Sequence, residues 1–186
     1  VAEGEMIPVA AIDEAGEGPR LSPATRLTGE ASQWRLTGSK HWIGAGASAT
    51  HLAVLASSEK GLAWVLVPTD SEGVTRHIYP THDGRGGASF DFDLTLDETQ
   101  IIATDEIAQD ALTAYRELAM VLSSAETLGA TQAALDTTVD YTKQRIQFGQ
   151  PLASFQALQH RMSNMLIQTE LTRSLVYAAC EAADTG

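Results

Sequence analysis

Up to about residue 105, apolar residues form short runs of strand length, separated by polar or glycine-containing turns. Residues 51–56 and 62–67 are apolar runs joined by the polar turn 57–61, and residues 90–94 alternate between apolar and charged side chains. Such alternation places the apolar side chains on one face of a strand. Short strands with closely spaced turns are typical of antiparallel sandwiches and barrels. Further strands are expected at 34–38, 40–43 and 74–79, the first two separated by Gly38-Ser39.

From about Asp110 the apolar residues recur at spacings of three and four, which is the period of one helix face. A helix over 110–144 would be about 50 Å long, so it needs partners along its length. Gly149-Gln150-Pro151 interrupts the pattern, and Ser154 is expected to be the N-cap of a second long helix. We therefore expect an α+β fold, in which an antiparallel β-sandwich or barrel-like domain over 1–105 precedes two antiparallel helices of a four-helix bundle over 106–186.

The charge of the chain limits its partners. It carries 24 Asp and Glu against 12 Lys and Arg, which gives a net charge of −12. A surface of this sign repels phosphate backbones and anionic membranes, so neither a nucleic acid nor a membrane is expected as a partner. Cys180 is the single cysteine, which excludes an internal disulfide and fits a reducing compartment. With no signal-peptide pattern at the first residues, we expect a cytoplasmic protein.

Common catalytic and metal-binding motifs are not found in the sequence. The glycine-rich run 84–87 precedes a strand and does not open a helix, so it is interpreted as a loop and not as a phosphate cradle. Cys180 lies on an apolar helical stripe, where packing is the expected role. No metal site is expected, because the histidines show no ligand-like pairing: His41, His51, His77, His82 and His160.

A first distinctive segment runs from Trp34 to Ala47. A tryptophan at a strand end, followed by small residues, can offer a flat ring to a planar ligand while the backbone approaches closely. The alternative is a pair of core tryptophans, Trp34 and Trp42, followed by an ordinary loop. Periodicity does not separate the two interpretations.

A second distinctive segment, 141–151, brings an arginine, an amide and an aromatic to a helix C-terminus. Arg145 could bind a phosphate with two parallel hydrogen bonds, and Phe148 could pack on a ring. The alternative is a cation near the negative end of the helix dipole, with Gly149 as the C-cap.

Together, in this order, the two segments resemble the acyl-CoA dehydrogenase family. The first is similar to a motif of its middle domain, and Glu14-Ala15-Gly16-Glu17-Gly18 is similar to the acidic loop upstream. The second is similar to a stretch of its C-terminal helical domain. The quoted matches are Trp34-x-Leu36-x-Gly38-x-Lys40-x-Trp42-Ile43 and Arg145-x-Gln147-Phe148-Gly149-x-Pro151-x-x-x-Phe155-Gln156-x-x-x-His160.

The resemblance implies a chain without the family's N-terminal helical domain and last bundle helices. It implies FAD held between the middle domain of one subunit and the C-terminal domain of a neighbour. The implied reaction is α,β-dehydrogenation of an acyl-CoA in lipid or steroid side-chain catabolism, within a homo- or heterotetramer that passes electrons to an electron-transfer flavoprotein.

The same resemblance implies roles for individual residues. Glu117 matches a carboxylate that helps to bind the acyl-CoA. No catalytic residue is expected within the chain, because Ala119 occupies one known position of the base and the usual one would lie beyond Gly186. The residues expected to bind FAD are Trp42, Ile43, Gly44, Arg145, Gln147, Phe148 and Gln156.

Several positions depart from the family pattern. Gly44 replaces a hydroxyl residue close to the flavin, Asp13 replaces a threonine, Pro19 a serine and Met120 an arginine. These departures leave three hypotheses open. The chain is an ordinary homotetrameric member, the FAD-supporting non-catalytic subunit of a heteromeric enzyme, or a flavin-free structural or regulatory homologue.

Overall fold

The structure is a computed structural model that describes residues 4–16, 22–30 and 33–185. The chain divides into two compact units, residues 1–112 and 113–186.

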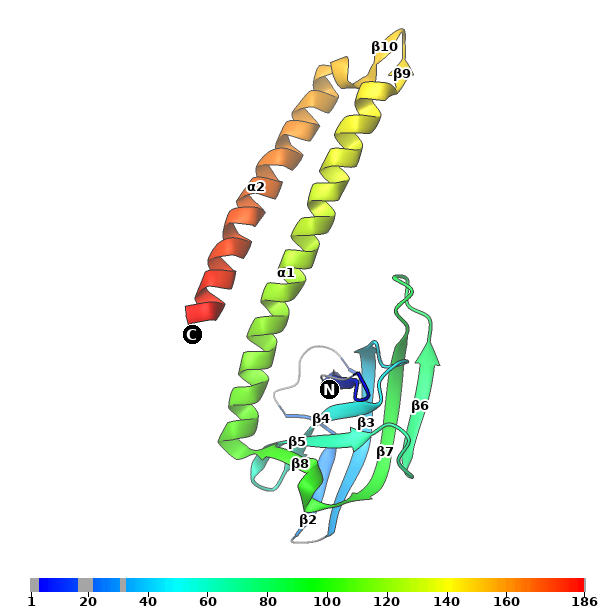
Figure 1. The fold of residues 1–186 in the computed structure, drawn as a ribbon, viewed down its shortest axis with the longest axis vertical. Helices are drawn as coiled ribbons and strands as arrows, with labels where there is room; N and C mark the ends of the chain where they lie inside the picture. The colour runs from blue at the N-terminus through cyan, green and yellow to red at the C-terminus, as the bar shows by residue number, and fades with distance from the viewer. Residues whose placement is uncertain (1–3, 17–21, 31–32, 186) are drawn as a thin grey trace. The chain divides into compact units, whose positions relative to one another are not determined.

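The first unit is built on an eight-stranded mixed sheet (Figure 1). Along the sheet the strands lie in the order β6-β7-β3-β2-β4-β5-β8, and β1 pairs with β4 outside this path. A short 3₁₀ turn, Glu98–Gln100, precedes the last strand. The strands are β1 (Pro8–Ala11), β2 (Arg26–Glu30), β3 (Gln33–Gly44), β4 (His51–Ser58), β5 (Gly61–Pro68), β6 (Val74–Tyr79), β7 (Gly87–Leu96) and β8 (Ile101–Thr104).

The two continuous apolar runs of the sequence are strands buried on both faces. On β4, Val54 belongs to the main core between the strands, whereas Leu55 faces a second cluster. That second cluster joins Trp64 of β5 to Ala108 and Leu112, which lie in the first turns of helix α1 (Asp105–Gln144). The Trp64 indole donates a hydrogen bond to the Ala108 carbonyl at 3.1 Å. A strand covered on both sides needs no polar face, which explains why alternation is missing there.

One predicted break in the sheet is wrong. Gly38-Ser39 does not separate two strands, because β3 runs unbroken from Gln33 to Gly44. Gly38 has φ +133, and a Cβ there would lie 2.7 Å from the Thr25 Cα. The glycine therefore serves the close approach of the segment before β2 and not a turn.

The predicted α+β fold class is confirmed, with two differences in detail. β1 and the first residue of β2 pair with β4 in parallel, so the sheet is not purely antiparallel. Strands β1, β2 and β8 were not predicted. Each is four or five residues long, too short to show a clear period.

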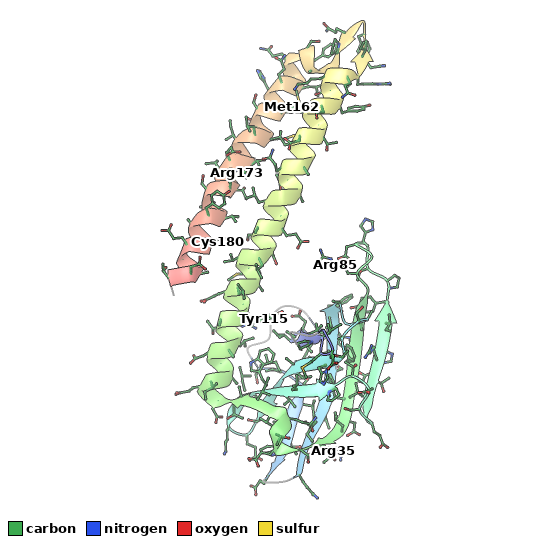
Figure 2. All side chains as sticks on the ribbon, in the orientation of Figure 1. Arg35, Arg85, Tyr115, Met162, Arg173 and Cys180 are labelled. Atoms are coloured by element: carbon green, nitrogen blue, oxygen red, sulfur yellow. The ribbon has the colours of Figure 1, made fainter. Side chains whose placement is uncertain are left out.

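In the second unit, α1 continues to Gln144, and α2 (Gln156–Thr185) returns antiparallel to it (Figure 1). Between them lie the short strands β9 (Ile146–Gln147) and β10 (Gln150–Pro151) and a 3₁₀ turn, Leu152–Ser154. Figure 2 marks two α2 residues, Arg173 and Met162, that contact α1. Arg173 donates to the Gln132 amide oxygen at 2.6 Å, and the Thr142 hydroxyl lies 3.4 Å from the Met162 sulfur.

The helix boundaries correct two expectations. Helix α1 begins at Asp105, five residues before the predicted start, in a polar turn that carries Asp105 and Glu106. Carboxylates suit a helix N-terminus, but they interrupt the apolar period. Ser154 is not the N-cap of α2, because it lies in the 3₁₀ turn and its hydroxyl donates to the Pro151 carbonyl at 2.6 Å.

Both helices leave large apolar side chains in contact with solvent. They occur along most of α1 and α2 in the second unit: Tyr115, Leu118, Met120, Leu122, Tyr141, Leu166, Ile167, Leu171, Leu175 and Tyr177. Extended exposed apolar surface of this kind marks an interaction surface. Of the helices in the described part of the chain, none has the length and apolarity needed to cross a membrane.

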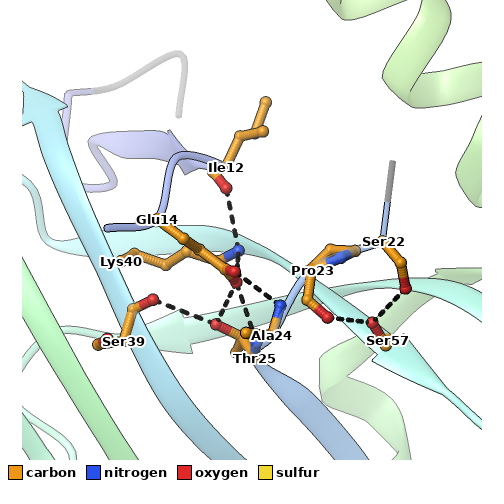
Figure 3. A network of polar contacts seen from close by, with 9 residues as sticks. All are labelled: Ile12, Glu14, Ser22, Pro23, Ala24, Thr25, Ser39, Lys40 and Ser57. Atoms are coloured by element: carbon orange, nitrogen blue, oxygen red, sulfur yellow. Dashed lines mark hydrogen bonds and ion pairs between the residues drawn. The ribbon is translucent and has the colours of Figure 1, made fainter. Parts of the chain in front are cut away.

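A buried ion pair connects the segment before β2 to the sheet (Figure 3). The Lys40 side chain is 0% exposed and its ammonium donates to Glu14 at 2.8 Å and to the Ile12 carbonyl at 3.0 Å. The Glu14 carboxylate, 8% exposed, also accepts from the backbone N–H of Ala24 and from the backbone and hydroxyl of Thr25. One buried carboxylate thus joins three segments that are distant in sequence.

The hydrogen bonds decide the ionisation of Glu14. Burial by itself raises the pKa of a carboxyl, but the donors from Lys40, Thr25 and Ala24 outweigh it and hold the Glu14 pKa at about 2, below the ordinary 4.5. Burial lowers the Lys40 pKa, and the Glu14 carboxylate opposes that effect. The stability that Glu14 contributes is fully present above its unfolded pKa and is lost as the pH falls through its folded pKa.

Glu14→Gln is expected to lower the free energy of unfolding at pH 7 by about 3–5 kcal/mol, because it leaves the Lys40 ammonium buried without its counter-charge. On acidification from pH 5 towards pH 2, the wild-type protein should lose about 3 kcal/mol more than the variant. Urea unfolding at each pH measures both effects.

The matched control is Asp93→Asn, which removes the carboxylate from an ion pair with Arg35 in which both side chains are more than half exposed. Exposed pairs are worth about 1 kcal/mol or less, so this variant should titrate like the wild type. Equal acid sensitivity of the wild type and Glu14→Gln would contradict the role assigned to the buried pair.

Candidate functional site

In the first unit, Trp42 interrupts the end of β3. The pairing of β3 with β7 shifts register between Lys40 and Ile43, which is a β-bulge. Trp42 adopts φ +60, a left-handed conformation that is unfavourable for a bulky residue, and its side chain is 74% exposed. The interpretation of Trp34 and Trp42 as two core residues is therefore wrong for Trp42. Trp34 is half-buried against the main core.

The two residues after Trp42 differ in their surroundings. Ile43 is buried in the core, whereas Gly44 is exposed and a Cβ there would meet no atom within 4 Å. The chain then turns, with the Gly46 N–H donating to the Ile43 carbonyl at 3.1 Å and Ala45 at φ +58. We call residues 42–44 the Trp42 edge. Its open side presents a flat ring and bare backbone.

Asp13 lies beside this edge. Its carbonyl accepts a hydrogen bond from the His41 N–H at 2.8 Å, and its side chain is exposed. The acidic loop upstream of the Trp42 edge is therefore fixed to β3 through both Asp13 and Glu14. Glu17, Gly18 and Pro19 lie outside the described residues.

In the second unit, β9 and β10 form a two-residue hairpin, with Gln150 opposite Gln147. Its central residues, Phe148 at φ +54 and Gly149 at φ +79, both have left-handed backbones, as type I′ hairpin turns require. Phe148 is 89% exposed and meets the Phe155 ring edge to face at 6.1 Å. Gly149 is thus a turn residue and not the C-cap of α1, which ends at Gln144.

Arg145 joins α1 to this hairpin. Its N–H donates to the Tyr141 carbonyl, and its own carbonyl accepts from the Leu152 N–H, each at 2.9 Å. The side chain is exposed, and no residue in 4–16, 22–30 or 33–185 forms an ion pair with its guanidinium. Two amides of the same connecting region are also exposed: Gln147 on β9 and Gln156 at the first position of α2. We call the set of Arg145, Gln147, Phe148 and Gln156 the Arg145 hairpin.

The three α1 residues compared above with the family pattern, Glu117, Ala119 and Met120, lie within about one turn of the helix. Glu117 and Met120 are exposed, and Ala119 is half-buried. Cys180, marked in Figure 2, is half-buried on α2.

The left-handed backbones of Trp42 and Phe148 were not predicted. A weak signal was present at Phe148, because glycine at the next position can adopt the left-handed backbone of a tight turn. No such signal marks Trp42, since a bulge depends on its partner strand. Within the residues described, no three His, Cys, Asp or Glu side chains are grouped as metal ligands.

Two hollows in the described part of the chain are lined by other residues. One of about 450 Å³ in the first unit is lined by Leu27, Trp34, Lys60, Ile101 and their neighbours. A groove of about 730 Å³ between α1 and α2 is lined by Thr127, Thr131, Arg161, Met165 and others. At the Trp42 edge and the Arg145 hairpin, the aromatic side chains are instead open to solvent, with Trp42 74% and Phe148 89% exposed.

Comparison with known proteins gives a consistent result. Residues 13–97 match the acyl-CoA dehydrogenase middle domain, and residues 108–186 match the C-terminal domain of the same family. The probable acyl-CoA dehydrogenase FadE25 of Mycobacterium tuberculosis is 29% identical, over 100% of this chain and 50% of the relative. The chain spans about half the length of the curated relatives it matches.

Two solved structures extend the likeness to the fold. The ChsE4-ChsE5 complex from Mycobacterium tuberculosis is similar with a TM-score of 0.81 and 27% identity, covering 97% of this chain and 48% of the other. A glutaryl-CoA dehydrogenase from Mycobacterium smegmatis in complex with FADH2 gives a TM-score of 0.84 and 26% identity, covering 100% and 49%. By its two matched domains, this chain belongs to the acyl-CoA dehydrogenase family.

Proposed function

We propose that the chain is part of a subunit of an FAD-dependent acyl-CoA dehydrogenase. In this proposal the Trp42 edge lies against the flavin ring, and the Arg145 hairpin reaches the FAD of a neighbouring subunit. FAD, when bound, would supply a hydride acceptor for the dehydrogenation of an acyl-CoA thioester. Glu117 would help to bind that thioester, and no residue of the chain would act as the catalytic base.

The Arg145 hairpin fits an adenine dinucleotide. The guanidinium has several N–H donors and no ion-pair partner among the described residues, so it can take a diphosphate with two parallel hydrogen bonds. Exposed amides of Gln147 and Gln156 can add neutral hydrogen bonds, and Phe148 offers an almost fully exposed ring.

The observation that carries the proposal is the conformation of Phe148. An aromatic residue in the first left-handed position of a tight hairpin costs stability, because Asn, Asp or Gly suits that position. Burial of the Phe148 ring does not compensate this cost in stability, because the side chain is 89% exposed. Strain of this kind persists where a side chain must be presented to a partner.

Arg145→Gln is expected to weaken FAD binding by about 10- to 100-fold, which is the worth of charge-assisted hydrogen bonds to a phosphate. The control is Lys143→Gln, which removes the same charge from an exposed residue in the last turn of α1. It should change the affinity by less than about threefold, because screened charges contribute little. Fluorescence titration of the apoprotein with FAD measures both affinities. An equal loss of affinity in the two variants would show that Arg145 acts only through its charge and not through a specific contact.

Phe148→Asn is expected to separate stability from function. Asparagine is favoured at this position of a type I′ turn, so the hairpin should keep or gain stability while FAD affinity falls. Thermal unfolding and FAD titration are the two measurements. The control is Ile146→Thr, which removes an exposed apolar side chain two residues away and should leave FAD affinity unchanged. An unchanged affinity in Phe148→Asn would remove the main support for the proposal.

A second candidate is the FAD-supporting subunit of a heteromeric enzyme. Two features of the Trp42 edge favour it. First, Gly44 has no hydroxyl side chain, although a Cβ at this position would meet no atom within 4 Å. Second, the exposed Asp13 carboxylate would disfavour a negatively charged reduced flavin. The structurally similar ChsE4-ChsE5 protein is itself a complex of two different chains. In this form the Arg145 hairpin would serve the flavin of the partner.

Visible flavin absorbance of the purified full-length protein, alone and after co-expression with a neighbouring acyl-CoA dehydrogenase subunit, is expected to distinguish the candidates. A homomeric enzyme carries flavin alone, and a heteromeric subunit only with its partner. A protein colourless in both states would contradict both and would favour a flavin-free homologue. Turnover of straight-chain, branched and steroid side-chain CoA thioesters by the coloured form would then identify the acyl group.

A further inference from the structure

The turn after the Trp42 edge is held by an arginine from another strand. Arg76 of β6 donates from one guanidinium nitrogen to the Ala47 carbonyl at 3.2 Å and from another to the Ala49 carbonyl at 3.1 Å. Ala49 is buried, and its carbonyl also accepts from the Thr69 hydroxyl at 3.0 Å. Two charge-assisted bonds to successive parts of one turn fix its path more firmly than neutral bonds would.

Arg76 is itself fixed against the sheet. Its guanidinium lies over the Phe90 ring at 5.5 Å from the centroid, and Phe90 is completely buried opposite Arg76 in the β6–β7 pairing. A guanidinium stacked on a buried ring keeps its plane and therefore the direction of its donors. A lysine at this position could reach one carbonyl but could not reproduce the fork.

A second residue of β6 meets the tryptophan itself. The Tyr79 ring lies 6.2 Å from the Trp42 ring at an interplanar angle of 68°. Tyr79 is opposite Gly87 in the pairing, and a Cβ on Gly87 would come within 2.5 Å of the tyrosine ring. The absence of that side chain lets Tyr79 lie directly against the backbone of β7, where its ring can stop the rotation of Trp42.

We infer that β6 positions the Trp42 edge, with Arg76 fixing the turn that follows the edge and Tyr79 fixing the orientation of the exposed ring. Both act through Trp42 and its neighbours, so they are positioning residues. Trp42 has a left-handed backbone and a largely exposed ring, so burial restrains its side chain only weakly. Strand β6 supplies the missing restraint. The functional part of the inference rests on the proposed contact between the Trp42 edge and flavin.

The test is made on the full-length protein, assembled with its partner subunits and labelled with 5-fluorotryptophan. In the flavin-depleted form, the fluorine resonance that disappears in Trp42→Phe reports Trp42. Arg76→Met and Tyr79→Leu are expected to shift or broaden this resonance and to leave those of Trp34 and Trp64 in place. Tyr79→Phe should retain the wild-type position, because the ring and not the hydroxyl makes the contact.

Matched controls come from the same sheet. Arg35→Met removes an arginine that pairs with Asp93 and contacts no part of the turn, and Ile78→Ala shortens the exposed neighbour of Tyr79. Neither should move the Trp42 resonance. An unchanged Trp42 resonance in both β6 variants, or equal movement of the Trp34, Trp42 and Trp64 resonances, would overturn the inference. If Arg76→Met does not fold, Arg76→Lys should show a smaller shift of the same resonance.

Affinity for FAD then separates this inference from the proposed function. Reconstituted Arg76→Met and Tyr79→Leu are expected to bind FAD about three- to tenfold more weakly, the worth of one misplaced aromatic contact. A displaced Trp42 resonance with unchanged FAD affinity would uphold the positioning role of β6 and count against a flavin at the Trp42 edge.

Discussion

The buried ion pair between Glu14 and Lys40 is the constraint on which the first unit depends. Moving two charges out of water is costly, and only close pairing with further hydrogen bonds compensates the cost. Here the carboxylate receives donors from Lys40, Ala24 and Thr25, which belong to two different segments. The pair therefore joins the loop of Glu14 and the segment before β2 to β3, where Lys40 stands two residues before Trp42.

Local strain follows from the same arrangement. With Lys40 held inside the unit, the bulge that follows turns Trp42 outward in a left-handed conformation. The same device occurs independently in the second unit, where Phe148 has a left-handed backbone and is even more exposed. Two exposed aromatic residues in unfavourable backbone conformations, each anchored by its own unit, are the physical argument that both surfaces bind a partner.

The chain belongs to the acyl-CoA dehydrogenase family, but it departs from the family pattern at some positions and keeps it at others. The Arg145 hairpin presents an exposed guanidinium, two exposed amides and an exposed aromatic ring, which the proposed function assigns to a dinucleotide. The Trp42 edge combines a well-held ring with a bare Gly44 and a nearby Asp13 carboxylate. In the proposed function, one half of the flavin site is intact and the other altered, as division of labour between unlike subunits would produce.

The sequence by itself determined the α+β class, the long helices, the apolar runs of β4 and β5 and the two segments that carry the family likeness, because these depend on local period and composition. Tertiary structure decided the rest. Gly38 resembles a turn in the sequence, but it allows Thr25 to approach an unbroken strand. Trp42 could be a core residue by pattern, and only the register of β3 against β7 turns it outward. Arg76 and Tyr79 carry no motif, and their role exists because strand pairing brings β6 beside a turn some thirty residues away, a contact that no local pattern encodes.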